Sequence, residues 1–270
     1  MRTVSRFFLV LCLLGVAVPL GWVLLSSVKS GAEILGHPWA LPNGLHWSNY
    51  AKAWGEAGIG RAFLNSLVVT LATLAILLPI GAMAAYVLAK YAFVGRRAVQ
   101  AVFLSGMMFP HFLVVVPLFL MLRDLRLLDT LTGLVVVYVA YSLSFTIFVL
   151  TGFFQTLPDE LAEAASLDGA SHATIFWRLI LPNSGPALAT VGIFAFIYTW
   201  RDFMGPLLYL NSPENQTLEL GLNTYRALNQ EQWELLMAGS VLVMIPLLIL
   251  FLLGQRYFVK GIVMSGGGGR

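Results

Sequence analysis

The chain has 270 residues, of which 59% are hydrophobic and only 11% are charged. Soluble domains carry roughly a quarter charged residues, so this chain has too few charges to cover a water-facing surface. The composition excludes a soluble enzyme, a disordered chain and a disulfide scaffold, and it indicates an integral membrane protein. The net charge of +3 excludes a nucleic-acid partner, and no group of His, Cys or acidic residues has the spacing of a metal site.

Six apolar segments are long enough to cross a bilayer, which takes about 20 mostly apolar residues in a helix. The bilayer offers no water to backbone groups, and the segments lack the alternation of barrel strands. We therefore expect an all-α membrane protein with six transmembrane helices. The predicted spans are Phe7–Val28, Ala62–Ala89, Ala98–Leu122, Leu131–Phe153, Ala187–Leu208 and Leu235–Phe258.

Lysine and arginine residues in short connections indicate the orientation, because they gather on the cytoplasmic side. The tight connection from Lys90 to Arg97 is the strongest such signal, and it predicts that both termini face the cytoplasm (N-in, C-in). Residues 29–61 and 211–234 are then external connections, and residues 154–186 are cytoplasmic. The tryptophans of the first external connection are typical of an interfacial belt, and a partner-binding loop is the alternative.

The cytoplasmic connection 154–186 is predicted to form two short helices joined by a sharp turn. Asp159 complements the positive end of the first helix dipole, and Gly169 permits the positive φ that stops this helix. Ser171 is the expected N-cap of a second, amphipathic helix that runs to Leu181, where Pro182 ends it. The surface is acidic and rich in small residues. Anionic lipid would repel such a surface, so we expect a docking element for another protein rather than a lipid-bound linker.

The same segment resembles the EAA loop of type I permease subunits of ABC importers. The resemblance lies in the spacing of its key residues. Glu163-Ala164-Ala165 is followed after three residues by Gly169, and Gly169 is followed after nine residues by residues 179–182 (Leu-Ile-Leu-Pro). The family usually has isoleucine at the position of Leu179. Asp168, Ala170 and Phe176 fit the version of the loop in sugar transporters. Residues 200–203 (Trp-Arg-Asp-Phe) are similar to a Trp-Asn-Asp-Phe segment of carbohydrate permeases, and residues 255–261 to the tail of the second permease subunit of the maltose importer.

The resemblance implies a type I ABC importer permease architecture in a prokaryotic inner membrane, with a carbohydrate as solute. The loop would dock on a cytoplasmic ATPase subunit, and ATP and Mg²⁺ would be bound there, with no cofactor and no catalytic residue in this chain. It also implies a second permease subunit in a heterodimer, a second ATPase subunit, an extracytoplasmic solute-binding protein and membrane lipid. The residues assigned to ATPase coupling are Glu163, Ala164, Ala165, Asp168, Gly169, Ala170, Phe176, Leu181 and Pro182, with a C-terminal ATPase contact at Gln255, Arg256 and Gly261.

The expected organisation has three parts. Residues 1–60 hold the first helix and an external loop, residues 61–260 form the permease core with five helices, and residues 261–270 are a flexible cytoplasmic tail. Polar residues in the spans are candidates for the translocation path, and each has a structural alternative as an anchor, a hydrogen-bonding group or a helix-packing group. These candidates are Arg201, Asp202, His111 and Asn65.

Two other functions remain open from the sequence. One is an ABC importer permease for a non-sugar solute such as a glycerophosphate. The other is a stand-alone secondary transporter, which would usually place paired charges inside the spans. Dependence on an ATPase partner separates the transporter from the importer.

Overall fold

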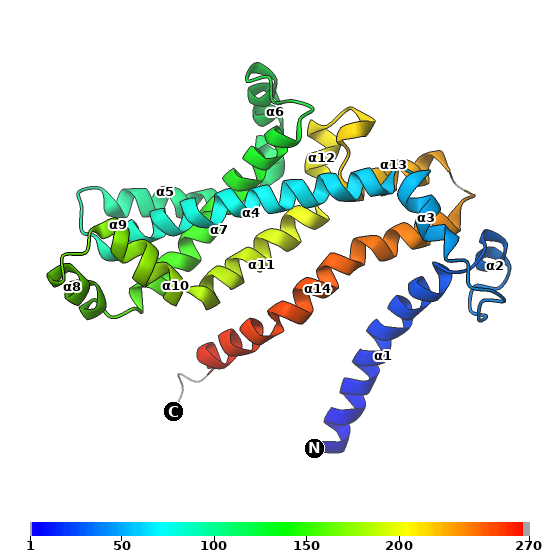
Figure 1. Ribbon diagram of the computed structural model, residues 1–270, viewed down its shortest axis with the longest axis horizontal. Coiled ribbons are helices and arrows are strands. Elements are labelled where there is room, and N and C mark those ends of the chain that lie inside the picture. Colours follow the sequence, from blue (N-terminus) through cyan, green and yellow to red (C-terminus); the bar gives the residue numbers. More distant parts are fainter. Residues whose placement is uncertain (1, 230, 267–270) are drawn as a thin grey trace. The chain divides into compact units, whose positions relative to one another are not determined.

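The computed structural model describes residues 2–229 and 231–266, and it describes side chains for residues 6–110, 112–229 and 231–255. Every regular element in this part of the chain is a helix (Figure 1). The chain forms two compact units. The first unit contains residues 1–65 and 216–249, and the second contains residues 66–215 and 250–270. The predicted tail lies outside the described residues from position 267 onward.

Four helices in the described chain are long and apolar enough to cross a membrane, and two bent helix pairs raise the number of candidate spans to six. The predicted all-α membrane fold is thereby confirmed. Prolines 19, 79 and 246 lie inside these long helices and do not end them. The four helices are α1 (Arg2–Ser26), α4 (Ile59–Lys90), α7 (Leu131–Gln155) and α14 (Trp233–Gly266).

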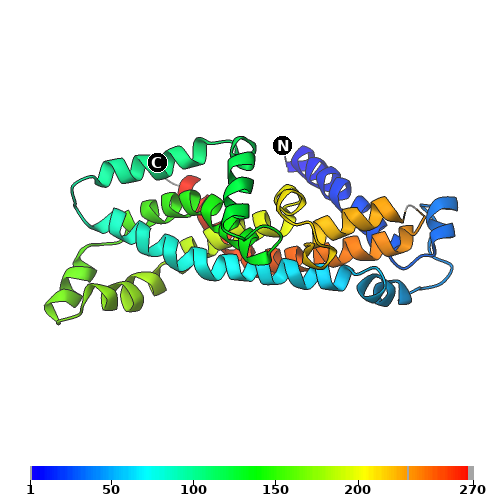
Figure 2. The ribbon, with the colours of Figure 1, turned by 90° about the horizontal axis from the view of Figure 1, so that it is seen from above.

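The third predicted span, Ala98–Leu122, is not one continuous helix. It consists of α5 (Arg96–Met108), a 3-10 turn (His111–Val114) and α6 (Val115–Asp124), and its two halves are bent by 95° (Figure 2). The bend falls at Phe109 and Pro110, whose backbones are both extended. A proline disfavours the helical conformation in the residue before it and has no N–H to donate, which explains the break.

The fifth predicted span, Ala187–Leu208, is also too long. Helix α11 (Gly185–Arg201) ends where Asp202 becomes extended, and a separate short helix, α12 (Met204–Tyr209), follows. Upstream, the segment His172–Asn183 meets α11 at a bend of 76°. The first break falls at Arg201 and Asp202, two charged residues that the predicted span included because apolar residues continue on both sides of them.

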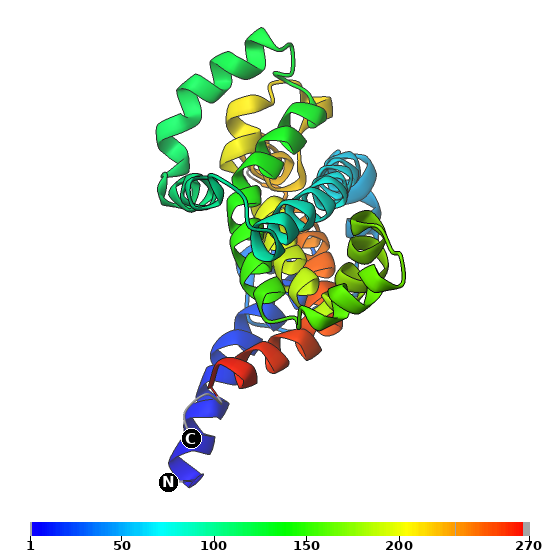
Figure 3. The same cartoon turned by 90° about the vertical axis from the view of Figure 1, so that its left-hand side faces the viewer.

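Helix α7 is the centre of the second unit, where it packs against α5, α11 and α12 (Figure 3). Leu134, Tyr138 and Leu150 on α7 are each at most 1% exposed. Helix α4 approaches α7 closely at Gly81, where an added Cβ would lie 2.5 Å from Cγ2 of Thr146. Only a residue without a side chain fits there.

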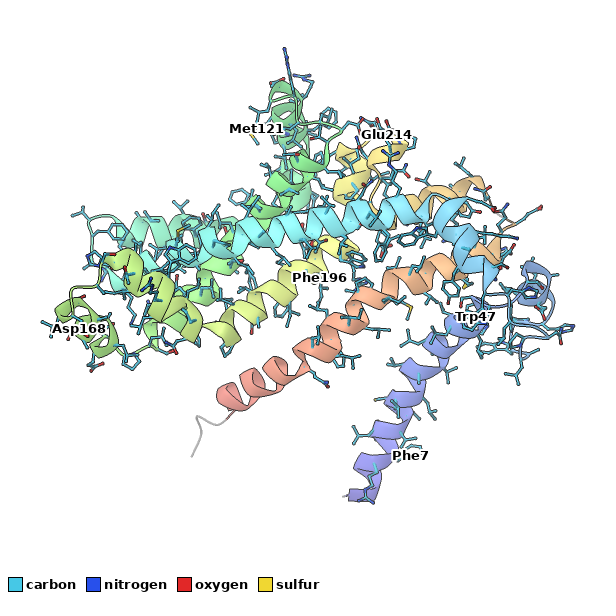
Figure 4. All side chains as sticks on the ribbon, viewed as in Figure 1. Phe7, Trp47, Met121, Asp168, Phe196 and Glu214 are labelled. Atoms are coloured by element: carbon cyan, nitrogen blue, oxygen red, sulfur yellow. The ribbon has the colours of Figure 1, made fainter. Side chains whose placement is uncertain are left out.

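The first unit holds the connection that follows α1, with α2 (Gly31–Gly36) and α3 (Ser48–Gly55), and also α13 (Leu218–Leu228). Lys29 is 1% exposed, and its ammonium donates to the carbonyl of Pro38 at 3.0 Å. The indole of Trp22 donates to the same carbonyl at 2.9 Å. Trp47, labelled in Figure 4, is exposed and stacks on Tyr50. Buried hydrogen bonds therefore fix the path of this connection.

Candidate functional site

The segment 154–186, here called the coupling segment, contains the predicted helix, turn and helix. Helix α8 (Glu160–Leu167) is followed by Gly169, whose φ is +81°, and then by α9 (His172–Ile175). The hydroxyl of Ser171 accepts the N–H of Thr174 at 3.3 Å, as an N-cap does. The predicted turn and cap are both confirmed. Asp168 lies at the outer tip of this hairpin (Figure 4).

The second helix does not end at Pro182, which corrects the prediction. It continues through a π-turn (Phe176–Ile180) into α10 (Leu181–Asn183). The N–H of Leu181 donates to the carbonyl of Phe176, five residues back. A wider turn of this kind accommodates the proline ring, which would clash with the carbonyl four residues before it. The hydroxyl of Ser184 donates a hydrogen bond to the carbonyl of Ile180 at 2.6 Å, so this backbone acceptor has a partner.

One face of the second helix is buried against the second unit. Ile175, Phe176 and Ile180 are at most 4% exposed. The ring of Phe176 lies 5.3 Å from that of Tyr86 on α4, and Tyr86 also contacts Phe154 of α7 at 6.4 Å. Phe176, predicted as a residue of the ATPase-coupling loop, therefore belongs to the core beneath the coupling segment.

Helix α8 has the opposite character, because none of its eight described residues is buried. Glu163 and Ala164 are exposed, and so is Asp168 beyond the end of the helix. Leu161 is 45% exposed and Leu167 is 90% exposed. A helix normally buries an apolar stripe on its own domain. This one turns only the half-buried Ala162 and Ala165 toward the core, and it presents carboxylates and leucines outward. We call this outward face the α8 surface; it is formed by Leu161, Glu163, Ala164, Leu167 and Asp168.

Two residues at the end of α4 hold the coupling segment in place. The ammonium of Lys90 donates to the carbonyl of Leu157 and pairs with the carboxylate of Asp159, both at 2.6 Å. The hydroxyl of Tyr91 is 2.8 Å from Nδ1 of His172. In the sequence, Lys90 indicates only the orientation of the chain in the membrane, and neither of these contacts was predicted. Because Lys90 and Asp159 are 69 positions apart, no local pattern in the sequence could have paired them.

Two of the polar candidates for the path, Asp202 and Asn65, are already engaged in structural contacts. The carboxylate of Asp202 accepts the hydroxyl of Tyr138 at 2.8 Å and the N–H of Gly205 at 3.0 Å, within the second unit. The amide of Asn65 donates to the carbonyl of Gln216 at 2.9 Å within the first unit. Arg201 is exposed.

Three of the predicted positions fall at or beyond the limits of the described side chains. His111 begins the 3-10 turn, but its side chain lies outside the described residues, as does that of Arg256. Gly261 is described only as part of the backbone of α14. Gln255, the third member of the predicted C-terminal contact, is exposed on α14, and its amide donates to the carbonyl of Leu252 at 3.1 Å.

A cavity of about 380 Å³, here called the α7 cavity, lies among α5, α7 and α11 in the second unit. Its lining consists of aromatic, hydroxyl-bearing and small residues and one methionine, and none of its described residues is charged. Thr146 is 1% exposed, and its hydroxyl has no hydrogen-bond partner within the described structure. Arg201, Asp202 and Asn65 do not belong to the described lining. The residues that line the cavity are Gly106, Met107, Tyr141, Ser142, Phe145, Thr146, Phe194, Ala195 and Tyr198.

Comparison with known proteins connects this architecture to a family. Residues 77–264 match the model of the binding-protein-dependent transport system inner membrane component. The chain is 40% identical to the diacetylchitobiose uptake system permease protein NgcG of Streptomyces coelicolor, over 97% of this chain and 87% of that protein. It is 30% identical to the melibiose/raffinose/stachyose import permease protein MelC of Bacillus subtilis, over 91% and 89% of the two chains.

A solved structure has the same fold. The crystal structure of a bacterial ABC transporter involved in the import of the acidic polysaccharide alginate contains a chain with a TM-score of 0.79 and 24% identity, covering 95% of this chain and 96% of that one. The family resemblance and the type I permease fold expected from the sequence are both confirmed. The chain belongs to the family of binding-protein-dependent transport system inner membrane components, as the non-catalytic, multi-pass permease subunit of a bacterial ABC importer.

Proposed function

We propose that this permease forms half of the translocation path for an uncharged disaccharide or oligosaccharide, driven by ATP hydrolysis in a partner subunit. An extracytoplasmic binding protein would deliver the solute. Two relatives named for the uptake of diacetylchitobiose and of melibiose, raffinose and stachyose support a carbohydrate. The exposed α8 surface is the observation that carries the ATPase-driven part of the proposal.

The α8 surface fits a docking site for the ATPase subunit. Glu163 is exposed, and would pair with a basic residue of the partner. Leu167 is 90% exposed, and burial of its side chain against a partner is favourable. The helix on the other side of Gly169 is anchored in the core through Phe176 and Ile180. A partner bound to α8 would therefore hold a segment that is fixed to the rest of the permease.

The α7 cavity supports an uncharged sugar as solute. The aromatic rings of Tyr141 and Tyr198 offer flat apolar faces, and the hydroxyls of Ser142 and Thr146 offer hydrogen bonds. The Thr146 hydroxyl is buried without a partner, which costs about 1–3 kcal/mol, and a hydroxyl of the solute would recover this cost once the side chain turns toward the cavity. A phosphate group would be desolvated in such a lining without any cation to compensate it. The cavity therefore favours a saccharide over the glycerophosphate that the sequence left open.

The remaining partners belong to the same proposal. The membrane-spanning part of α1 is 0% buried, and membrane lipid and a second permease subunit, in a heterodimer, would cover its apolar side chains. Two ATPase subunits would bind the ATP and Mg²⁺. Gln255, Arg256 and Gly261 would add a C-terminal contact to one of them.

The test begins with gentle detergent extraction of the tagged chain from its native membrane, followed by mass spectrometry of the proteins that co-purify. We expect an ATPase and a second permease. The binding protein of the same system is then titrated by calorimetry with N,N′-diacetylchitobiose, raffinose and glycerol 3-phosphate, and a sugar is expected to bind. A chain that purifies alone and moves solute without ATP would overturn the importer mechanism, and binding of glycerol 3-phosphate alone would overturn the carbohydrate.

A matched pair of variants tests the α7 cavity. Thr146→Val removes a buried hydroxyl from a residue that lines the cavity, and we expect sugar uptake to fall by up to about tenfold, the effect of one lost hydrogen bond. Thr151→Val is the control, because Thr151 is also buried on α7 with an unpartnered hydroxyl but does not belong to the described lining of the α7 cavity. Neither change breaks a hydrogen bond that the structure contains. Equal uptake by the two variants would argue against solute binding in this cavity.

A further inference from the structure

The end of α4 contacts both ends of the hairpin formed by α8 and α9. Lys90 is the last residue of α4, and it reaches Leu157 and Asp159 just before α8 begins. Tyr91 follows, and it reaches His172 at the start of α9. Helix α4 is not a chain neighbour of this hairpin, since α5, α6 and α7 all lie between them in the sequence. These contacts therefore create a connection that the covalent chain does not provide.

The contact of Lys90 is more than a surface ion pair. Its side chain is only 10% exposed, whereas that of Asp159 is 74% exposed. The ammonium is thus largely withdrawn from water, and it donates to a backbone carbonyl as well as to the carboxylate. Charge-assisted hydrogen bonds in such a position are stronger than exposed pairs, which contribute little. The segment that leads into α8 is therefore held to the end of α4.

The contact of Tyr91 fixes the other arm of the hairpin. Its hydroxyl bonds to His172 at 2.8 Å and lies 3.3 Å from the hydroxyl of Tyr86, one turn earlier on α4. The rings of Tyr91 and His172 meet edge to face, 5.4 Å apart. Tyr86 in turn packs on Phe176. With both arms fixed to one end of α4, the hairpin cannot turn without moving that helix.

We propose that Lys90 and Tyr91 are positioning residues that transmit movement of the coupling segment into helix α4. A pull on α8 would otherwise reach α4 only through the apolar contact of Phe176 with Tyr86 and through the chain neighbours α7 and α11. Packed helices move as units when two points on them are held, and a second attachment thus makes α4 follow the hairpin. The inference rests on the proposed docking of α8 to an ATPase.

The test measures hydrogen exchange by mass spectrometry on the purified importer assembly, with ADP and then with ATP and vanadate. In the unaltered assembly we expect vanadate trapping to change exchange in residues 160–175 and in residues 66–81 of α4. In Lys90→Met the exchange change in residues 160–175 should persist, while the change in residues 66–81 should fall about fivefold or more. A factor of about five is the lower end of typical coupling between two sites. Tyr91→Phe should act in the same direction.

Two further variants separate transmission from other roles. Arg97→Met removes an exposed cation from the same connection and should leave both changes intact. Lys90→Asp combined with Asp159→Lys restores an ion pair of reversed sign but leaves the carbonyl of Leu157 without its donor, and it should recover only part of the α4 response. Such recovery is the coupling that a double-mutant cycle detects.

Each remaining outcome counts against a named claim. An α4 response in Lys90→Met equal to that of the unaltered assembly would overturn the transmission role. Loss of both responses in Lys90→Met would also overturn it, because Lys90 would then serve docking itself. An unaltered assembly without any change in residues 160–175 would refute the docking of α8, and the inference would fail with it.

Discussion

Asp202 offers a sharp test of whether a polar residue in a span lines the path or holds the fold. Its carboxylate accepts hydrogen bonds from the hydroxyl of Tyr138 and from the N–H of Gly205. Tyr138 is 1% exposed, so its hydroxyl has no access to water when the carboxylate is removed. Gly205 follows the break between α11 and α12, and the second bond therefore stabilises the start of α12. Both contacts indicate a structural role.

The size of the effect follows from these two bonds. A hydrogen bond to a charged group contributes about 1.5–3 kcal/mol, and Asp202 is only half-buried, which favours the lower value. We expect Asp202→Ala to lower the free energy of unfolding by about 3 kcal/mol. Asp202→Asn keeps an acceptor oxygen at the same place and should cost about 1 kcal/mol. Arg201→Ala, at an exposed neighbour, should change stability by less than about 0.5 kcal/mol.

The assay is reversible unfolding in mixed micelles, followed by tryptophan fluorescence, with sugar uptake measured in parallel. A double-mutant cycle with Tyr138→Phe should show a coupling of about 1 kcal/mol between the two residues. If Asp202→Ala unfolds like the unaltered protein while uptake is lost, Asp202 contacts solute and the structural reasoning is wrong. If stability and uptake are both unchanged, the two hydrogen bonds contribute nothing, and the reasoning fails as well.

Three other changes have defined outcomes. Glu163→Lys should lower the amount of ATPase subunit that co-purifies with the permease at least about fivefold, with membrane insertion unchanged, whereas Glu160→Lys should not lower it. Equal amounts of ATPase with the two variants would contradict docking through Glu163. Gly169→Val should strain the turn by at least about 1–2 kcal/mol and uncouple transport from hydrolysis, whereas Gly169→Asn, which tolerates positive φ, should retain coupling. The Ser212 hydroxyl is the largest cause that lowers the pKa of Asp129 from 3.8 to about 2. The stabilisation from Asp129 should therefore be complete above about pH 5 and lost progressively toward about pH 1, and Asp129→Asn should abolish this pH dependence in unfolding scans.

The sequence by itself was enough to predict the membrane class and the coupling hairpin. Long apolar segments must form helices in lipid, since every backbone group has to be satisfied within the segment. The turn at Gly169 and the cap at Ser171 depend on neighbouring residues only, so the local sequence specifies them. The spacing from Glu163 to Pro182 likewise pointed to the family that the comparisons confirmed.

Other features depend on contacts between residues that are far apart in the chain. The break after Met108 lies within an apolar stretch, where hydropathy has no signal and Pro110 decides the break. The break after Arg201 is marked in the sequence by two charged residues, but the contacts of the Asp202 carboxylate appear only in the folded chain. The partner of Asp202 is 64 positions away, and Phe176 is buried by a tyrosine of another helix.

Only the tertiary structure showed how α4 holds the coupling segment. Lys90 looks in the sequence like any lysine at the end of a span, and its low exposure and its two acceptors appear only after the chain has folded. The α7 cavity likewise draws its lining from three helices, α5, α7 and α11, and no single segment reveals it. Local sequence determines which residues form a helix, whereas packing decides which side chains from distant helices meet.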